Sequence, residues 1–161
     1  MIFRLVLACA AIACTLPAAA SDERAQIDAL VAQHAKAHGI PATLVHRVIK
    51  RESGYNPRAS HSGNFGLMQI RYATARGMGY RGTVAGLLDA NTNLTYAVPY
   101  LANAYTVAGG NPDRAVALYA SGYYYEAKRK GLLHALRTGP SDPVATGTVS
   151  APAGFASASA R

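Results

Sequence analysis

An apolar helical face that ends on a glutamate is the feature that most constrains this chain. Residues 41–52 begin at a proline, and four apolar side chains recur along them at spacings of three and four: Leu44, Val45, Val48 and Ile49. Glu52 lies on the same face, and Ser53-Gly54 then ends the helical pattern at once. The sequence therefore predicts a carboxyl group in the last turn of a helix, directed where core residues are directed.

Three glutamates follow residue 20, and only one of them lacks an ordinary explanation. Glu23 falls in a first helical turn, where a carboxylate is favourable, and Glu126 precedes a basic run that offers an exposed ion pair. Glu52 follows an apolar face instead. Burial favours the protonated form of a carboxyl group, and a general acid must carry that proton. The structural alternative is an ion pair with Arg47 or Arg51, or a carboxylate that faces water at the helix end.

The first twenty residues have the pattern of a secretory signal peptide. One early arginine, an apolar run and small residues precede Ser21, which predicts cleavage after Ala20. The run is too short and too rich in alanine to favour a membrane-spanning helix, and a lipid anchor at Cys14 is a weaker alternative. We therefore expect an exported protein of the periplasm or cell envelope. Both cysteines, Cys9 and Cys14, lie in this leader, so the exported chain would have no thiol for a disulfide, a metal or nucleophilic catalysis.

The charge of the chain, +8, favours contact with an anionic polymer. The only dense basic run, Lys128-Arg129-Lys130, is typical of a solvated helix face, so we expect no nucleic-acid partner. His34 and His38 lie four residues apart on an expected helix, but no glutamate or third ligand accompanies them. We expect no metal and no cofactor.

A chain of 161 residues, half of them hydrophobic, suits a single mainly α domain built from short helices. Helical patterns and their end signals predict five or six short helices, with candidates over 21–38, 41–52, 67–77, 92–108, 112–120 and 124–136. Residues 54–66 read as a loop with at most a small hairpin near 60–65, and residues 81–89 are ambiguous. The expected organisation is a signal peptide over 1–20, one domain over 21–137 and a disordered tail over 138–161. The tail is rich in small residues, contains several prolines and has no apolar pattern.

Two polar residues in the expected helices are candidates for substrate contact. Gln69 is the polar member of Gly66-Leu67-Met68-Gln69-Ile70, and its amide can both donate and accept hydrogen bonds, as sugars require. Taken alone, this motif is an ordinary helix start. Tyr119, just before the Ser121-Gly122 break, is the candidate among ten tyrosines, although the usual role of a helical tyrosine is core packing.

Six short motifs occur in the order and spacing of a known family: Glu52-Ser53, Asn56-Pro57, Gly66–Ile70, Ala73-Thr74-Ala75, Asn93-Leu94 with Tyr100-Leu101, and Tyr119-Ala120-Ser121-Gly122. Over roughly residues 25 to 135 the chain resembles the SLT-type lytic transglycosylase domain, the goose-lysozyme-like group of the lysozyme-like superfamily. The chain departs from the family pattern at Ala120, where asparagine is usual, at Tyr72, where proline is usual, and at Ala97, where glycine is usual. These departures bear on substrate subsites rather than on the glutamate.

The resemblance implies a lysozyme-like bundle that cleaves peptidoglycan glycan strands between N-acetylmuramic acid and N-acetylglucosamine, leaving 1,6-anhydromuramyl ends. It assigns Glu52 as the acid and then the base, Ser53 and Gln69 as hydrogen-bonding neighbours of Glu52, and Asn93 and Tyr119 as residues near the reacting sugar. Ordinary glycosidases need a second carboxylate. None accompanies Glu52 in its motif, which fits a reaction in which the 6-hydroxyl of the substrate attacks.

Two other functions stay open at this point. The same scaffold could carry a hydrolytic muramidase, or a non-catalytic module that binds the cell wall or helps to assemble a secretion machine. The sequence also leaves open whether the chain remodels wall generally or serves a secretion or conjugation machinery. We expect a monomer.

Overall fold

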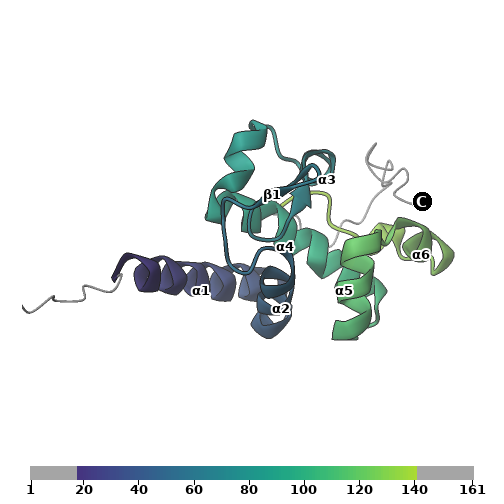
Figure 1. Ribbon diagram of the computed structural model, residues 1–161. Helices are drawn as coiled ribbons and strands as arrows, with labels where there is room; N and C mark the ends of the chain where they lie inside the picture. Colours follow the sequence, from purple (N-terminus) through teal and green to yellow (C-terminus); the bar gives the residue numbers. More distant parts are fainter. Residues whose placement is uncertain (1–17, 141–161) are drawn as a thin grey trace, which may run out of the picture.

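The computed structural model describes residues 18–140, which form a mainly helical domain with one small antiparallel sheet (Figure 1). The helices are α1 (Ala18–His38), α2 (Ala42–Glu52), α3 (Tyr72–Gly77), α4 (Ala90–Val107), α5 (Pro112–Ser121) and α6 (Tyr124–Arg129), with 3-10 turns at Val84–Leu88 and Leu133–Ala135. The strands are β1 (Ser60–His61), β2 (Asn64–Phe65) and β3 (Ile70–Arg71), in the order β1-β2-β3. The mainly α, lysozyme-like prediction is confirmed.

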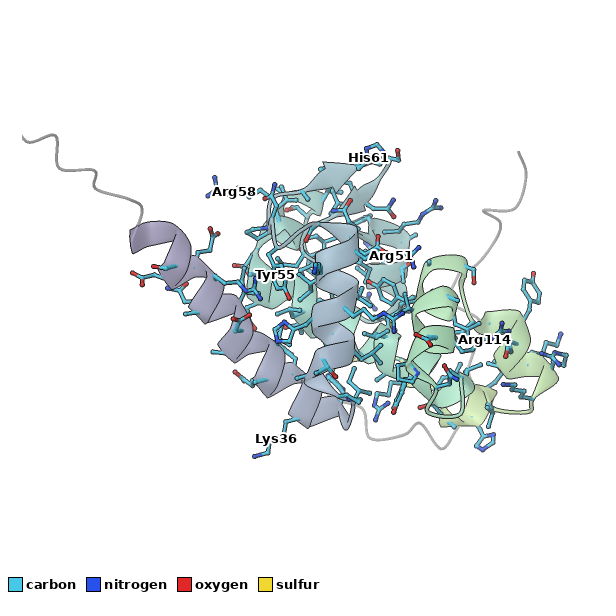
Figure 2. The ribbon with its side chains drawn as sticks, turned by 60° about the horizontal axis from the view of Figure 1, so that its bottom comes forward. Lys36, Arg51, Tyr55, Arg58, His61 and Arg114 are labelled. Carbon is cyan, nitrogen blue, oxygen red and sulfur yellow. The ribbon has the colours of Figure 1, made fainter. Side chains whose placement is uncertain are left out.

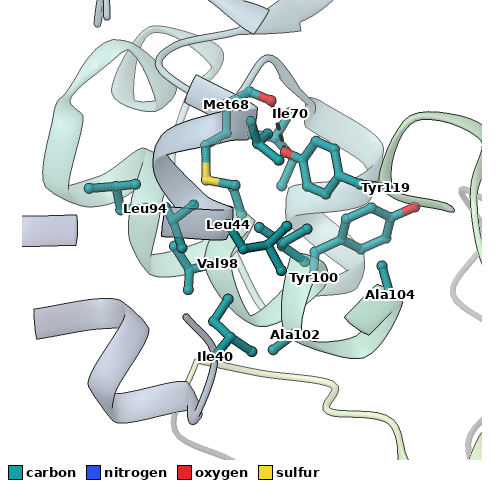
Figure 3. Close-up of a cluster of buried hydrophobic side chains, with 14 of the residues drawn as sticks. Ile40, Leu44, Met68, Ile70, Leu94, Val98, Tyr100, Ala102, Ala104 and Tyr119 are labelled. Carbon is teal, nitrogen blue, oxygen red and sulfur yellow. Dashed lines mark hydrogen bonds between the residues drawn. The ribbon is translucent and has the colours of Figure 1, made fainter. Parts of the chain in front are cut away.

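The central element is α4, which packs against both α1 and α5. Eleven of its eighteen residues are buried, as expected for a helix that is apolar on nearly every side. Figure 3 shows its Leu94, Val98 and Tyr100 in one cluster with Leu44 of α2 and Met68 from the loop before β3. The core therefore joins the helices to the segment that carries the sheet.

The ends of the two C-terminal core helices follow local sequence signals. Asp89 accepts a hydrogen bond from Thr92 N at 2.8 Å and so caps α4, while Asn111 caps α5 through Arg114 N at 3.0 Å. Gly122, at φ 86°, ends α5 as predicted. The N-terminal helix differs from the prediction, because it begins at Ala18 and runs through the expected cap at residue 21.

The helix predicted over 67–77 is wrong in its first half. Residues 67–69 form a turn and Ile70–Arg71 form the third strand, so α3 begins only at Tyr72. Gly66 and Gln69 both have positive φ, 73° and 48°, which is incompatible with a continuous helix. The hairpin near 60–65 is confirmed, since β1 pairs with β2 there.

The C-terminal helix is also shorter than predicted. α6 ends at Arg129, and Gly131, at φ 68°, separates it from the final 3-10 turn. Beyond it, Arg137 N donates to Asn103 Oδ1 at 2.8 Å, and residues 138–140 run past Gly79. The described domain therefore continues three residues into the segment predicted as a tail.

The rest of that segment, 141–161, lies outside the described residues, as do residues 1–17 of the predicted signal peptide with both cysteines. Between residues 18 and 140, no helix has the length and apolar character needed to cross a membrane.

Candidate active site

Glu52 is the last residue of α2, at the end of a buried stripe made by Leu44, Val45, Val48 and Ile49. Its side chain is 25% exposed, so it lies at the edge of the core rather than inside it. Arg51 Nε lies 3.6 Å from Glu52 Oε1, on the solvent side. The predicted place of the carboxyl group in the helix is confirmed, and the carboxylate is open to a ligand.

Tyr119 of α5 binds the loop before β3 and lies near the Glu52 carboxylate. Its hydroxyl donates to Met68 O at 2.8 Å, a hydrogen bond that is drawn in Figure 3. Burial holds the pKa of the Tyr119 hydroxyl well above its ordinary value, and the neighbouring Tyr100 and the Glu52 carboxylate raise it further. Tyr119 is therefore a neutral donor close to Glu52, with its ring in the core.

Asn93 lies deeper in the molecule than the sequence suggested, because its side chain is fully buried. Its Oδ1 accepts from Met68 N at 2.9 Å, and its Nδ2 donates to Phe65 O at 2.8 Å and to Leu87 O at 2.9 Å. Every strong hydrogen-bonding position of this amide except one lone pair is used by backbone groups. The amide of Asn93 therefore lies behind the loop that carries Met68, and its predicted place near the reacting sugar stays a prediction.

Gly66 is the residue that lets the loop approach Asn93 so closely. A Cβ at this position would lie 2.2 Å from Asn93 Nδ2 and 2.2 Å from Leu87 O, far inside contact distance. Its φ of 73° is also in the left-handed region that glycine tolerates best. The Gly66–Gln69 turn is therefore wrapped over the amide of Asn93.

The two expected hydrogen-bonding neighbours of Glu52 bond elsewhere. Ser53 Oγ donates to Ile49 O at 3.3 Å, the usual back-bond of a serine at a helix end. Gln69 Nε2 donates to Ala59 O at 3.0 Å and to Gly66 O at 2.9 Å, which closes the loop on itself. Within residues 18–140, Gln69 Oε1 accepts no hydrogen bond and is not buried, so it is available to a ligand.

The other acidic groups near this segment in sequence have separate structural roles. Asp28 pairs with Arg24 on α1, at 2.9 Å, and Asp89 caps α4.

The two histidines weighed as metal ligands lie in different surroundings. His34 Nε2 and Asn91 Oδ1 are 2.9 Å apart, and burial lowers the pKa of His38. In the part of the chain that the structure describes, no three histidine, cysteine or acidic side chains gather in a group that could hold a metal ion.

A comparison with protein families now bears on this arrangement. The Transglycosylase SLT domain matches residues 29–133, more than half of the 161-residue chain. The chain belongs to the SLT transglycosylase family. Enzymes of this family act on peptidoglycan, so the match supports peptidoglycan as the substrate class and a transglycosylase-type enzyme in general.

The three departures from the SLT pattern occupy different environments. Ala97 is fully buried in α4, and Tyr72 stands at the start of α3, with its hydroxyl donating to Gly82 O at 3.1 Å. Ala120 is exposed beside Tyr119. Of these three residues, only Ala120 is both exposed and directly beside a candidate site residue.

Sequence reasoning missed the Met68 peptide as the element that links the site residues. Asn93 accepts its N–H and Tyr119 donates to its carbonyl, although 25 and 51 residues separate them from Met68. A buried asparagine in an apolar helix was the available signal, since such an amide is costly unless backbone groups satisfy it. Arg51, directly before Glu52, was weighed only as a structural partner.

Proposed function

We propose that this SLT domain is a lytic transglycosylase that cleaves the β-1,4 bond between N-acetylmuramic acid and N-acetylglucosamine, with Glu52 as general acid and then base. The observation that carries the proposal is the position of Glu52. It ends a buried stripe, stays 25% exposed and lies close to the buried Tyr119 hydroxyl. The acidic residues Asp28 and Asp89, which flank it in sequence, are occupied elsewhere.

In the proposed reaction, Glu52 first gives its proton to the glycosidic oxygen, which leaves as the hydroxyl of N-acetylglucosamine. The 6-hydroxyl of the muramyl residue then attacks C1 while the Glu52 carboxylate accepts its proton. One bond breaks, one forms and no water is added. A single carboxyl group can carry both steps because it is regenerated, and the second carboxylate of ordinary glycosidases is not needed.

The remaining candidate residues divide into two proposed roles. Gln69 Oε1 accepts hydrogen bonds from the amide or hydroxyl groups of the bound sugar, and Ser53 holds the end of α2 at the catalytic residue. Asn93 and Tyr119 are positioning residues, which act through the Met68 peptide that both of them bind. The proposal includes export to the periplasm or cell envelope, where the substrate lies, after loss of residues 1–20.

Product analysis tests the chemistry directly. Purified protein is incubated with peptidoglycan, the released muropeptides are divided, and one half is reduced with borohydride before mass spectrometry. Anhydromuramyl ends have no reducing aldehyde, so we expect their masses to stay unchanged on reduction. Products that take up hydrogen would identify a hydrolytic muramidase, and a lack of any release would identify a binding module.

A further inference from the structure

The described arginines fall into two groups according to what their guanidinium groups contact. Eight of them contact a carboxylate, a backbone carbonyl or an aromatic ring: Arg24, Arg47, Arg51, Arg76, Arg81, Arg114, Arg129 and Arg137. Within residues 18–140, the Arg58 and Arg71 side chains make no such contact, and Arg51 contacts only Glu52, at 3.6 Å and without a hydrogen bond. These three lie in the segment that begins beside Glu52 and ends with β3.

The charge balance of the chain changes at the same place. Residues 42–81 carry one carboxylate, Glu52, against seven basic side chains: Arg47, Lys50, Arg51, Arg58, Arg71, Arg76 and Arg81. The remaining described residues are almost balanced, with seven basic and six acidic side chains. An excess of cationic side chains next to a candidate site attracts an anionic ligand.

The geometry brings Arg51 to the reacting end of this surface. Its side chain is 56% exposed and its Nε lies 3.6 Å from Glu52 Oε1. Farther out, Asn64 pairs with both His61 and Arg71, so these side chains share the sheet face opposite the buried Ile70. Figure 2 shows Arg51 beside α2, and Arg58 and His61 at the side of the molecule where the sheet lies.

We propose that Arg51 is a specificity-determining residue that binds a carboxylate carried by the muramyl residue at the scissile bond. The inference rests on the proposed function, because Glu52 defines which sugar lies there. Before cleavage Glu52 must be protonated and neutral, so Arg51 then has no anionic partner among residues 18–140. A carboxylate of the substrate replaces it, held by the two parallel N–H donors that a guanidinium offers.

Two carboxylate sources exist on such a strand, the stem peptide and the lactyl group that remains when the peptide is removed. Three soluble glycan substrates separate them: strands with native stem peptides, the same strands with their carboxylates methyl-esterified, and strands stripped of peptide by an amidase. The value of kcat/KM is measured on each for wild type, Arg51→Gln and Lys36→Gln. Lys36 is an exposed cation of α1 and serves as the control for loss of one charge.

We expect wild type and Lys36→Gln to prefer native over esterified strands by about tenfold, the worth of one charge-assisted contact. Arg51→Gln should lower this preference to about one. If stripped strands react like native ones, the free lactyl carboxylate takes the place of the stem-peptide carboxylate at Arg51; if they react like esterified ones, only the stem-peptide carboxylate binds there.

Two outcomes would overturn the inference: a preference that survives in Arg51→Gln, or an equal fall on all three substrates, which would mean that Arg51 acts on Glu52 alone. The proposed function fails separately. Reducing ends in the products, with the Arg51-dependent preference intact, would reject the transglycosylase reaction and leave the carboxylate contact standing.

Discussion

The segment from Glu52 to Arg71 and the helix pair α4–α5 are held in shape by opposite means. The helices satisfy their ends with their own neighbours, since Asp89 and Asn111 cap them within three residues. The segment has only two-residue strands, and it contains every non-glycine residue of the described chain with positive φ: Tyr55, Ser62 and Gln69. Such conformations persist when surrounding structure imposes them.

In this protein, contacts from the helices largely impose these positive-φ conformations. Asn93 and Tyr119 bind the Met68 peptide, and Arg24 of α1 stacks over the Tyr55 ring at 3.5 Å. Contacts from the helices on its inner side therefore fix the shape of this segment. On its outer face, Gln69 Oε1 and the Arg51 guanidinium make no hydrogen bond within residues 18–140. A site that binds a polar polymer needs this division: the polar groups on its inner side are hydrogen-bonded within the protein, and those on its outer side are available to the polymer.

The largest expected difference between the two regions is catalytic. Glu52→Gln keeps the shape of the side chain and removes its titratable proton, so activity on peptidoglycan should fall by about 10²- to 10⁴-fold while thermal unfolding stays cooperative. Glu126→Gln is the matched control in the helical region, where the carboxylate serves ion pairs. Residual activity of Glu52→Gln above a few per cent of wild type would reject Glu52 as the acid.

The second difference concerns glycines with similar backbone conformations. Gly66→Ala should destabilise the protein by about 3 kcal/mol or more, because the new Cβ would collide with Asn93 and Leu87 O in addition to the positive φ. Gly109 has a φ of 64°, and no atom lies within 4 Å of a Cβ added there. Gly109→Ala should therefore destabilise the protein by about 1 kcal/mol. Urea unfolding measures both. Equal losses would show that the Asn93 contact does not constrain the loop.

A third, smaller difference separates positioning from stability. Tyr119→Phe and Tyr123→Phe each remove one buried hydroxyl hydrogen bond, to Met68 O and from Asn103 Nδ2 respectively, and each should cost about 1 to 3 kcal/mol. Only Tyr119→Phe should also lower kcat, by about tenfold with KM little changed, because the loop facing the substrate moves. Steady-state kinetics at a temperature well below both melting points decides this. An equal fall in kcat for Tyr123→Phe would mean that loss of core stability, and not a change in the position of the loop, lowers kcat.

The smallest effect lies in the helical region and depends on pH. Glu126 bonds to Lys130 and to Arg114, and these contacts lower the pKa of its carboxyl group below the ordinary value of 4.5. A lowered pKa means that the pair stabilises the fold above pH 4.5 and that this contribution is lost as the pH falls through the folded pKa. Glu126→Gln should therefore lower the melting temperature at pH 7 and have a diminishing effect towards pH 3. A constant difference across that range would mean that the side chain acts by packing rather than by charge.

Sequence reasoning was most accurate where the deciding contacts are local. The cap of α5, its end at Gly122 and the place of Glu52 at the end of α2 all follow from neighbours within four residues. It failed over residues 67–71, where the pattern of apolar residues suits a helix but a turn and a strand form. Local preference is a weak force, and tertiary hydrogen bonds override it.

The sequence by itself determined the helical framework and the single carboxyl group at the end of an apolar face, because periodicity and capping operate over one or two turns. The tertiary structure alone decided that Asn93 lies behind the loop, that Gln69 adopts a left-handed conformation and that Arg51 is left without a hydrogen-bond partner among residues 18–140. Those outcomes depend on contacts such as Asn93 to Met68 and Tyr119 to Met68, which span 25 and 51 residues of chain. No local pattern encodes such a contact, because its free energy appears only when both partners have been brought together by the core.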